Sequence, residues 1–493
     1  MRTRFPVSPR SLAAALLAGL ALRLFFVFHF PFAAGDTKFY DELARNWLDH
    51  HVYGLFVGGR LVPSDMRAPG YPAFLAAVYS IFGRPPGYVF MAQAIVDLGT
   101  CLLAALIAAR LAPSPERRAV ATGALWIAAL CPFTANYAAV FLTEALATFC
   151  TACALLILVC ALDHAFLTDC DDGHARHDLL SFIGWIWLAG VSVGLGALVR
   201  PEAPLALMAA GVIFAIRLRR RTNWRKLVLT ASWMTVGLVL PLAPWAARNA
   251  RTIGRIEFLA PRYAETRGDF IPRGFFAWTR TWMVRYGDAY RVPWRLGKGT
   301  IATDALPASA FDSVTERARV EALLARYNTD LEMTPVLDRG FALLAQQRTS
   351  RNPLRTHLVI PAERALTMWL TPRVGFLRYS GQIVPIGERW RDNRADFATT
   401  VLFALLNLVY LGLALIGAWV CRGRPELHLL AAFILVRTAF LTELQTVEPR
   451  YVIECFPALL ATGGQAFPLL RRWTCSAAAE PISSDTLRCV YFR

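Results

Sequence analysis

The sequence lacks the cysteine pattern of a disulfide-stapled protein. Its polar region from Arg248 to Asp396 contains no cysteine, and most of the ten cysteines lie in apolar segments, so no disulfide framework is expected in that region. Charged residues are also scarce, at 18% of the chain against 56% hydrophobic residues. Together with a mean hydropathy of +0.41, this composition excludes an ordinary soluble domain and indicates a multi-span membrane protein.

Acidic residues are outnumbered by basic ones, 35 against 52, which gives a net charge of +17. The basic residues form short clusters between apolar segments, where they set the orientation of membrane spans. Nucleic acid is therefore not expected as a partner. A glycine-rich nucleotide-phosphate loop is also lacking, which argues against a soluble nucleotide sugar as a substrate.

The long apolar runs predict an all-α polytopic membrane protein with about ten transmembrane helices. The segment Gly70–Phe82 is apolar but too short to cross a bilayer, so we expect a re-entrant or juxtamembrane helix there. The predicted spans are Ser11–Phe30, Tyr88–Leu111, Ala119–Cys131, Ala138–Leu162, Leu180–Val199, Ala203–Ile216, Leu227–Ala247, Phe397–Cys421, Leu427–Leu441 and Tyr451–Leu470.

A first span that starts in the cytoplasm places all four basic clusters on one side, as the positive-inside rule requires. These clusters are Pro115–Arg118, Arg217–Lys226, Cys421–Arg424 and Arg471–Trp473. The expected parts of the chain are an N-terminal transmembrane module (1–247) that contains the first external loop (33–72), an external region (248–396), C-terminal transmembrane helices (397–472) and a cytoplasmic tail (473–493). We expect the inner (cytoplasmic) membrane, with the external region on the periplasmic face.

The external region has enough residues for a domain. Its middle, Phe311–Gln347, has a helical pattern, and the segment Ala365–Leu370 is apolar enough to lie on the membrane. No catalytic motif stands out within the region.

The first external loop places an acidic residue and a positively charged residue close to the membrane. Asp36 follows the first span, and Arg67 opens the next apolar stretch. Between them, apolar side chains from Phe39 to Leu48 recur at helical spacing, which predicts an amphipathic helix lying in the bilayer interface. We interpret this loop as the floor of an active site.

Ionisable residues gather at the external ends of the spans under this topology. Because charge placed against hydrocarbon is costly, such a gathering suggests a polar cavity open to that face. The residues are Asp36, Asp41, Arg67, Glu144, Arg200, Glu202, Arg248, Glu448 and Arg450.

Several of these residues also have a purely structural interpretation. Asp36 can cap the amphipathic helix by accepting from orphan backbone donors. Glu144 lies near the start of an apolar helix, where a carboxylate suits the helix dipole. Arg67 and Arg200 can extend toward the interface without binding anything.

Two further groups of polar residues are given no catalytic role. Arg23 and Asp97 lie within apolar runs and are expected to pair inside the bundle. The loop Asp163–Asp178 is interpreted as a solvated connection, although its histidines could ligate a metal. Those histidines are His164, His174 and His177.

Five short motifs occur in the order found in a known family. They are GDTKFYDELA (35–44), with an acid followed by Y-x-x-x-A, RAPGYP (67–72), TEAL (143–146) preceded by Pro132, RPE (200–202), and EPRY (448–451) followed by Pro457. In this order they resemble the glycosyltransferase family 39 type of integral-membrane transferase, within the C-type superfamily. That family includes protein O-mannosyltransferases and lipid A aminoarabinose transferases. The resemblance covers nearly all of the membrane part and does not extend to Arg248–Asp396.

The resemblance implies transfer of a sugar from a polyprenyl-phosphate carrier, on the external face, by an inverting displacement. It makes Asp36 the general base that acts on the acceptor hydroxyl, and Arg67 the residue that contacts the carrier phosphate. Many relatives have Lys-Pro-Pro where this chain has Arg67-Ala68-Pro69, so the acceptor class (lipid, glycan or protein) does not follow from the resemblance.

The chemistry of such a transfer agrees with these residue types. Fixed cations stabilise charge on the departing phosphate, and a carboxylate takes the proton of a hydroxyl acceptor. We expect no required cofactor, with a divalent metal possible, and membrane lipids as partners. The predicted site has Asp36 and Glu144 as catalytic carboxylates, Arg67, Arg200 and Arg450 as donor-phosphate ligands, and Tyr40, Tyr71, Glu202, Glu448 and Tyr451 as substrate-binding residues.

Two other functional classes are compatible with about ten spans. A secondary transporter should have two matching halves with broken helices near the midplane, and no internal repeat is visible in the sequence. A non-catalytic membrane scaffold would carry the external acids only incidentally.

Overall fold

The structure is a computed structural model that describes residues 5–33, 35–167, 175–219, 224–261 and 270–469. Helices make up most of these ranges, and the only strands within them are the short pair β1 and β2. The chain is therefore an all-α polytopic membrane protein, as its apolar runs predict. The expected cytoplasmic tail, residues 473–493, lies outside the described residues, as do the side chains of the three loop histidines.

Eight helices of the described chain are long and apolar enough to cross a membrane. A ninth span results if α5 (Arg117–Ala129) and the helical segment Pro132–Ala139, which is bent by 46° from it, count as one. That segment consists of α6 (Pro132–Ala135) and η1 (Asn136–Ala139). The eight are α1 (Pro9–His29), α4 (Pro86–Leu111), α7 (Glu144–Leu167), α8 (Ala175–Val199), α10 (Trp224–Thr252), α17 (Arg394–Val420), α18 (Pro425–Thr442) and the run Pro449–Leu469, which contains η6 (Pro449–Cys455), α19 (Phe456–Gly463) and η7 (Gly464–Ala466).

Length thus supports up to nine spans in the described ranges, against about ten predicted. The difference is α9, Leu205–Arg219, which occupies the predicted span Ala203–Ile216. Its apolar part, Leu205–Ile216, is shorter than the roughly 17 residues of a typical span. The ends of α8 and α10 nevertheless lie on the same side, because Arg200 and Arg67 line one cavity and Arg248 of α10 donates to the carbonyl of Ser64 in the first loop, so α9 has to return the chain to the opposite side.

Helix α7 begins at Glu144, six residues later than the predicted start at Ala138. The predicted start was wrong because residues 136–139 form the short helix η1, and the residues around Val140 pair their backbone with Phe32, which follows α1. Phe32 donates to the carbonyl of Ala139 at 2.9 Å, and Phe141 donates to the carbonyl of Phe32 at 3.0 Å. The consequence is that Glu144 lies in the first turn of α7, at the end of the bundle.

Two sets of contacts fix the helices that carry the site. Arg23 of α1 and Asp97 of α4 form the predicted ion pair inside the bundle, at 2.6 Å, with both residues buried. Helices α8 and α10 approach closely because a Cβ on Gly237 of α10 would lie 2.3 Å from the carbonyl oxygen of Trp187. Such crossings at small residues are common between membrane helices, and this one joins the middle of α8 to α10.

The first loop contains the predicted amphipathic helix as α2 (Thr37–His50) and the predicted short helix as α3 (Gly70–Phe82). Between them lies an antiparallel hairpin, β1 (Gly54–Val57) and β2 (Arg60–Pro63), which was not predicted. Gly58 and Gly59 form its two-residue turn with φ of +57° and +79°. Both values suit glycine, and a Gly-Gly pair between apolar residues is a hairpin signal that the helical interpretation of the loop overlooked.

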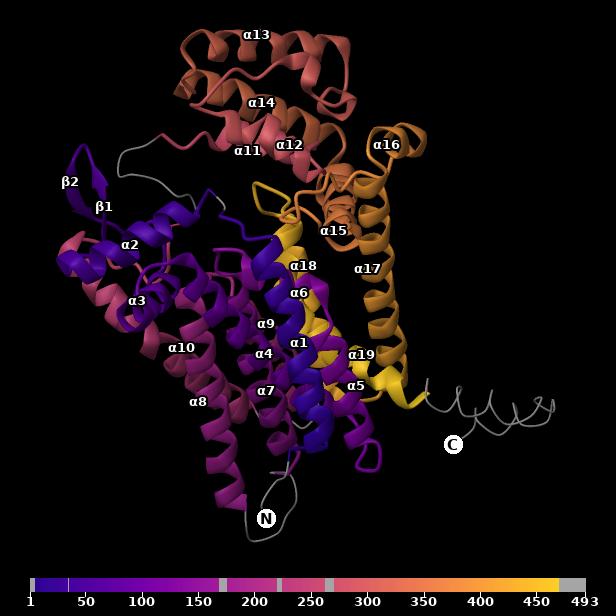
Figure 1. Cartoon of the computed structure of the whole chain (residues 1–493). Helices are drawn as coiled ribbons and strands as arrows, with labels where there is room; N and C mark the ends of the chain where they lie inside the picture. The colour runs from indigo at the N-terminus through magenta and orange to yellow at the C-terminus, as the bar shows by residue number, and fades with distance from the viewer. Residues whose placement is uncertain (1–4, 34, 168–174, 220–223, 262–269, 470–493) are drawn as a thin grey trace.

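The external region packs around its own apolar core, which includes Phe275, Trp278, Tyr327 and Phe341. The helical pattern predicted for Phe311–Gln347 is confirmed as two helices. Figure 1 shows this region stacked on the end of the bundle opposite the N-terminus. Its elements are α11 (Arg273–Arg280), α12 (Tyr286–Arg291), η2 (Pro293–Arg295), η3 (Thr303–Ala305), η4 (Ala308–Ala310), α13 (Val314–Asp330), α14 (Pro335–Arg351), η5 (Arg355–Val359), α15 (Ile360–Leu370) and α16 (Ile386–Asp392).

The alternation of helices gives the bundle two distinct ends. Arg110 near the end of α4 pairs with Asp163 of α7 at 2.9 Å. We expect a reporter enzyme fused within the external region to score as external, and one fused after Arg221 to score as cytoplasmic, because basic loops stay inside. Alkaline phosphatase and fluorescent-protein fusions measure this, and the reverse pattern would contradict the assigned sidedness.

Candidate functional site

Six separate chain segments line a cavity of about 280 Å³ at the external-region end of the bundle. They are the start of α2, the residues before α3, the residues that lead into α7, the break between α8 and α9, the residues Ala260 and Pro261, and the start of η6. We call this space the site cavity. Eight of the ten predicted site residues line it, namely Asp36, Tyr40, Arg67, Glu144, Arg200, Glu202, Arg450 and Tyr451.

Asp36 occupies the N-cap position of α2, but its side chain makes no capping hydrogen bond. Its carboxylate instead accepts from Nη2 of Arg67 at 3.0 Å and lies 3.8 Å from Nη2 of Arg450. The neighbouring Thr37 donates from Oγ1 to the carbonyl of Phe141 at 2.8 Å, which ties this turn to the residues before α7. The capping interpretation of Asp36 is therefore wrong for its side chain, which faces two cations.

Arg67 points into the site cavity rather than out to the interface. It lies beside the rings of Phe39 and Tyr40, with its guanidinium carbon 5.8 and 5.9 Å from their centroids, and its side chain is 18% exposed. The hydroxyl of Tyr53 donates to its carbonyl oxygen at 2.8 Å, so the backbone of the loop is also fixed. A rigid, half-enclosed guanidinium next to a carboxylate is typical of an anion-binding position.

Glu144 forms the rear of the site cavity and is 2% exposed. Its Oε1 lies 3.4 Å from Nη1 of Arg200 and 3.5 Å from Nη1 of Arg450, so one carboxylate orients two guanidinium groups. Its Oε2 is buried and has no hydrogen-bond partner among the described residues. An unpartnered buried carboxylate oxygen is costly, so this atom has an unused capacity to accept a hydrogen bond.

Arg200 is the centre of a charge network behind the site cavity. It lies 3.6 Å from Glu202 and 3.2 Å from Glu454, and Glu454 in turn pairs with Arg437 of α18 at 2.6 Å. Glu454 and Arg437 are both buried and were not among the predicted residues. A charge within an apolar span is the signal that points to them.

These charges determine the protonation of the groups at the α8–α9 break. Burial lowers the pKa of Arg200, but the carboxylates of Glu202, Glu454 and Glu144 raise it more, so its pKa lies above the ordinary value and the group stays charged. Burial raises the pKa of Glu202, but the charges of Arg200 and Arg437 outweigh burial and hold it below the ordinary value. Burial raises the pKa of Tyr40, which therefore remains a hydroxyl donor in the site cavity.

The two remaining predicted residues, Glu448 and Tyr71, do not line the site cavity. Glu448 pairs with Arg450 and accepts from the hydroxyl of Tyr451 at 2.7 Å, so it orients Arg450 from behind. Tyr71 is fully buried; it donates to Gln93 at 2.7 Å and contacts the ring of Tyr40 edge-on. These contacts suit a role in positioning Arg450 and Tyr40, and the expected role of Glu448 and Tyr71 in substrate binding stays a prediction.

The described residues contain no group of three His, Cys, Asp or Glu side chains arranged to hold a metal ion. The carboxylates of the site cavity are each engaged by an arginine. Metal dependence therefore stays a prediction, as does the division of the chain into the four parts given above.

No protein-family model matches the sequence, and no curated protein sequence matches it. Solved structures resemble the chain at low identity. The oligosaccharyltransferase AglB from Archaeoglobus fulgidus, in complex with an inhibitory peptide and a dolichol-phosphate, is 15% identical, with 97% of this chain and 52% of AglB covered and a TM-score of 0.49. ArnT from Cupriavidus metallidurans bound to undecaprenyl phosphate is 14% identical, with 96% of this chain and 81% of ArnT covered and a TM-score of 0.37.

Both proteins are glycosyltransferases of the C-type fold, the superfamily that the sequence motifs resemble. The chain spans about half the length of AglB. The assignment to family 39 stays a prediction. At these identities, conclusions about the substrates of this chain depend on its own site residues.

Proposed function

We propose that the chain is an integral-membrane glycosyltransferase, which moves a sugar from a polyprenyl-phosphate-linked donor to an acceptor hydroxyl with inversion. The acceptor is a lipid, glycan or protein, and the reaction takes place on the periplasmic face of the inner membrane. The observation that carries the proposal is the position of Asp36, whose carboxylate is free of capping and lies 3.0 Å from Arg67 at the site cavity. A base and an anion-binding cation are thereby adjacent.

The arginines supply the electrostatic part of the mechanism. As the bond between sugar and phosphate breaks, negative charge develops on the phosphate, and fixed guanidinium groups lower the barrier. Arg67 and Arg450 are the two that face Asp36, and both line the site cavity. Arginine binds phosphate through two parallel hydrogen bonds and stays charged at all working pH values.

Asp36 supplies the proton acceptor. Its side chain is 36% exposed, which leaves one edge of the carboxylate accessible to an entering hydroxyl. The hydroxyl loses its proton to Asp36 as its oxygen attacks the anomeric carbon from the side opposite the phosphate, and the single displacement inverts that carbon. Glu144, held between Arg200 and Arg450, keeps these cations in place and offers its free Oε2 to a sugar hydroxyl.

The location of the site argues against a secondary transporter. Transporter sites lie near the midplane, between broken helices of two repeats. Here Glu144 is the first residue of α7, Arg200 follows the last residue of α8, and Arg450 lies at the start of η6, so the charges meet at helix ends.

A donor test addresses the proposal directly. The protein, purified in detergent, is incubated with polyprenyl-phosphate sugars and a hydroxyl acceptor, and mass spectrometry measures the release of free polyprenyl phosphate. We expect release by the wild-type protein, and we propose that it needs no cofactor, so a chelator should leave it unchanged. Absence of release with every donor and acceptor tried, from a protein that binds the donor, would count against a transferase.

Arg67 should be needed for use of the donor. We expect Arg67→Ala to lower kcat/KM by about 10² to 10³-fold, as loss of one stabilising donor does, and Arg67→Lys to lower it by about tenfold, because lysine keeps the charge and loses the two-pronged contact. The matched control is Arg84→Ala, whose pair with Asp49 lies on the surface. Wild-type turnover of Arg67→Ala at subsaturating donor would refute the assignment.

A further inference from the structure

A second, larger cavity of about 520 Å³ lies within the external region, between α11, α14, η5 and α15 and the end of α18. We call it the outer cavity. Its volume is in the range of about 300 to 1,000 Å³ that is usual for ligand sites. It shares no lining residue with the site cavity, so the glycosyl transfer proposed above does not account for it.

The floor of the outer cavity carries positive charge that the protein itself does not fully satisfy. Arg364 of α15 is 1% exposed, and its guanidinium donates only to carbonyl oxygens, those of Met283 at 2.8 Å, Thr442 at 2.8 Å and Leu444 at 3.1 Å. Its Nη2 is buried without a hydrogen-bond partner among the described residues. A buried guanidinium with no paired carboxylate is costly, which suggests that an anion completes the site.

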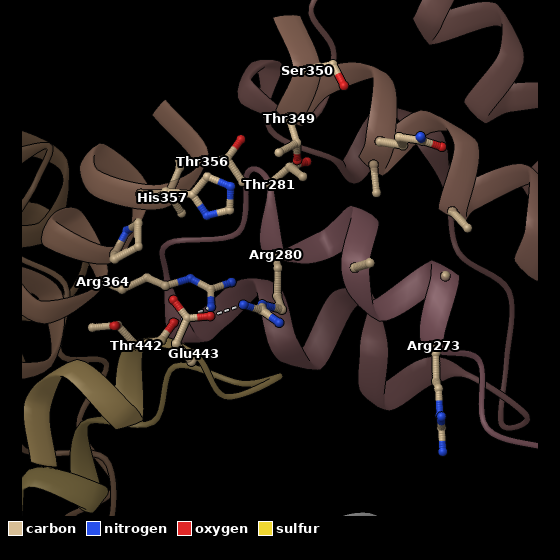
Figure 2. A pocket seen from close by; sticks show the side chains of 17 residues that line it. Arg273, Arg280, Thr281, Thr349, Ser350, Thr356, His357, Arg364, Thr442 and Glu443 are labelled. Atoms are coloured by element: carbon tan, nitrogen blue, oxygen red, sulfur yellow. Dashed lines mark hydrogen bonds and ion pairs between the residues drawn. The ribbon is translucent and has the colours of Figure 1, made fainter. Parts of the chain in front are cut away.

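Arg280 and Glu443 lie beside Arg364 in the outer cavity. Figure 2 shows the guanidinium groups of Arg280 and Arg364 and the carboxylate of Glu443 converging, with an ion pair between Arg280 and Glu443. Burial and the charge of Arg280 lower the pKa of Arg364 to about 10, against a smaller opposite effect of Glu443. Glu443 therefore neutralises only part of the charge of the two arginines.

The other residues that line the outer cavity indicate the chemical nature of the uncharged part of the ligand. Gln346, Thr349 and Ser350 present polar side chains from α14, beside small apolar residues such as Ala277 and Ala342. Helices α11 and α14 pack so closely that a Cβ on Gly274 would lie 2.1 Å from the carbonyl oxygen of Asp338, and small side chains line the cavity beside this contact. Hydroxyl and amide groups along one wall suit a hydroxylated ligand.

We propose that the outer cavity binds a phosphate-bearing group with a hydroxylated body, held between Arg280 and Arg364, with Glu443 as an internal competitor for Arg280. Two guanidinium groups match the several oxygens of a phosphate better than a single carboxylate does. The loop that starts at Glu443 leads to Glu448 and Arg450, so the ligand lies beside the segment that carries the third arginine of the site cavity. The ligand is either a soluble phosphosugar or the headgroup of an anionic lipid.

Binding is measured on the full chain in detergent by isothermal titration calorimetry, with inorganic phosphate and a hexose phosphate as probes. No donor or turnover is involved, so the result is independent of the proposed transferase activity. We expect Arg280→Gln to weaken binding by about tenfold, as loss of one charged contact does, and Glu443→Gln to tighten it several-fold by removing the carboxylate that pairs with Arg280. An arginine outside the cavity, substituted in the same way, distinguishes a site from general surface charge.

Both variants should fold, since the Arg280–Glu443 pair lies at an exposed edge with side chains 39% and 51% exposed. The matched control is Arg339→Gln on α14, because Arg339 is an exposed arginine that does not line the outer cavity, and this variant should bind like wild type. Nanodiscs of phosphatidylcholine with and without phosphatidylglycerol distinguish the two sources of the phosphate group, a soluble phosphosugar and the headgroup of an anionic lipid. If the anionic lipid competes with the hexose phosphate, the ligand is a headgroup; if it does not, the ligand is soluble.

Absence of phosphate binding at millimolar concentrations overturns the proposal. Weaker binding by Glu443→Gln also overturns it, because the carboxylate would then be part of the site instead of a competitor. An equal loss in Arg339→Gln and Arg280→Gln reduces the effect to net charge and overturns it as well.

Discussion

Asp36→Asn should give a folded protein that binds donor normally and turns over at least about a hundredfold more slowly than wild type, because loss of a general base costs about 10² to 10⁴ in rate. Asparagine is as good a helix cap as aspartate, so the substitution preserves any capping. It also keeps an oxygen that accepts from Arg67. It removes only the ability to take a proton at neutral pH. Initial rates of polyprenyl-phosphate release at saturating donor, with a separate donor-binding measurement, check this.

Asp41→Asn is the matched control on the same helix. Asp41 accepts from Tyr79 at 2.6 Å and from Arg45 at 2.8 Å and does not line the site cavity, so its rate should stay within a few-fold of wild type. Near-normal turnover of a well-folded Asp36→Asn protein would remove the catalytic role from Asp36. Glu144, with its free Oε2 in the site cavity, would then be the next candidate for the base.

Arg437→Met should destabilise the protein strongly. Arg437 and Glu454 are both almost completely buried and lie 2.6 Å apart, so removal of the arginine leaves Glu454 with less compensation in the bundle. Breaking such a pair from one side costs about 3 to 5 kcal/mol, whereas replacing both partners by apolar residues is often close to neutral. We expect a large fall in apparent Tm for Arg437→Met and partial recovery in the double variant Arg437→Met/Glu454→Met.

Recovery is expected to be partial because Glu454 also lies 3.2 Å from Arg200, which loses a partner in the double variant. The matched control is Arg317→Met on α13, whose partners Asp304 and Glu321 lie on the surface, where ion pairs contribute about 0 to 1 kcal/mol. Thermal unfolding in detergent, followed by tryptophan fluorescence, compares the variants. A double variant no more stable than Arg437→Met alone would contradict the pairing argument.

The sequence was sufficient to predict those parts of the fold that depend on local residue patterns. The helices α2 and α3 follow from apolar spacing between Asp36 and Phe82, and the long apolar runs predict most of the spans. The site residues Asp36, Arg67 and Glu144 were selected because their motifs occur in a known order, and the structure places all three at one cavity.

The parts that sequence reasoning missed depend on contacts between distant segments. The start of α7 at Glu144 follows from backbone pairing with Phe32, more than a hundred residues earlier, and no local pattern encodes that partner. Arg437 and Glu454 are single charges in apolar runs, and only packing of α18 against η6 shows that they belong to the same network as Arg200. The side chain of Asp36 likewise contacts Arg67 instead of capping its own helix, and this contact also joins segments that are distant in the sequence.

The buried pair of Arg23 and Asp97 also has a consequence for biogenesis. The two residues are 74 positions apart, so at about 5 to 20 residues per second the ribosome needs roughly 4 to 15 s to make the partner of Arg23. During that interval α1 enters the bilayer with an unpaired arginine, at a penalty of about 2.5 to 3.5 kcal/mol. The helix is apolar enough to insert nevertheless, but we expect it to remain at the translocon until α4 emerges. A nascent chain arrested before Asp97 should therefore crosslink to the translocon through α1, and one arrested after α4 has left the ribosome should not.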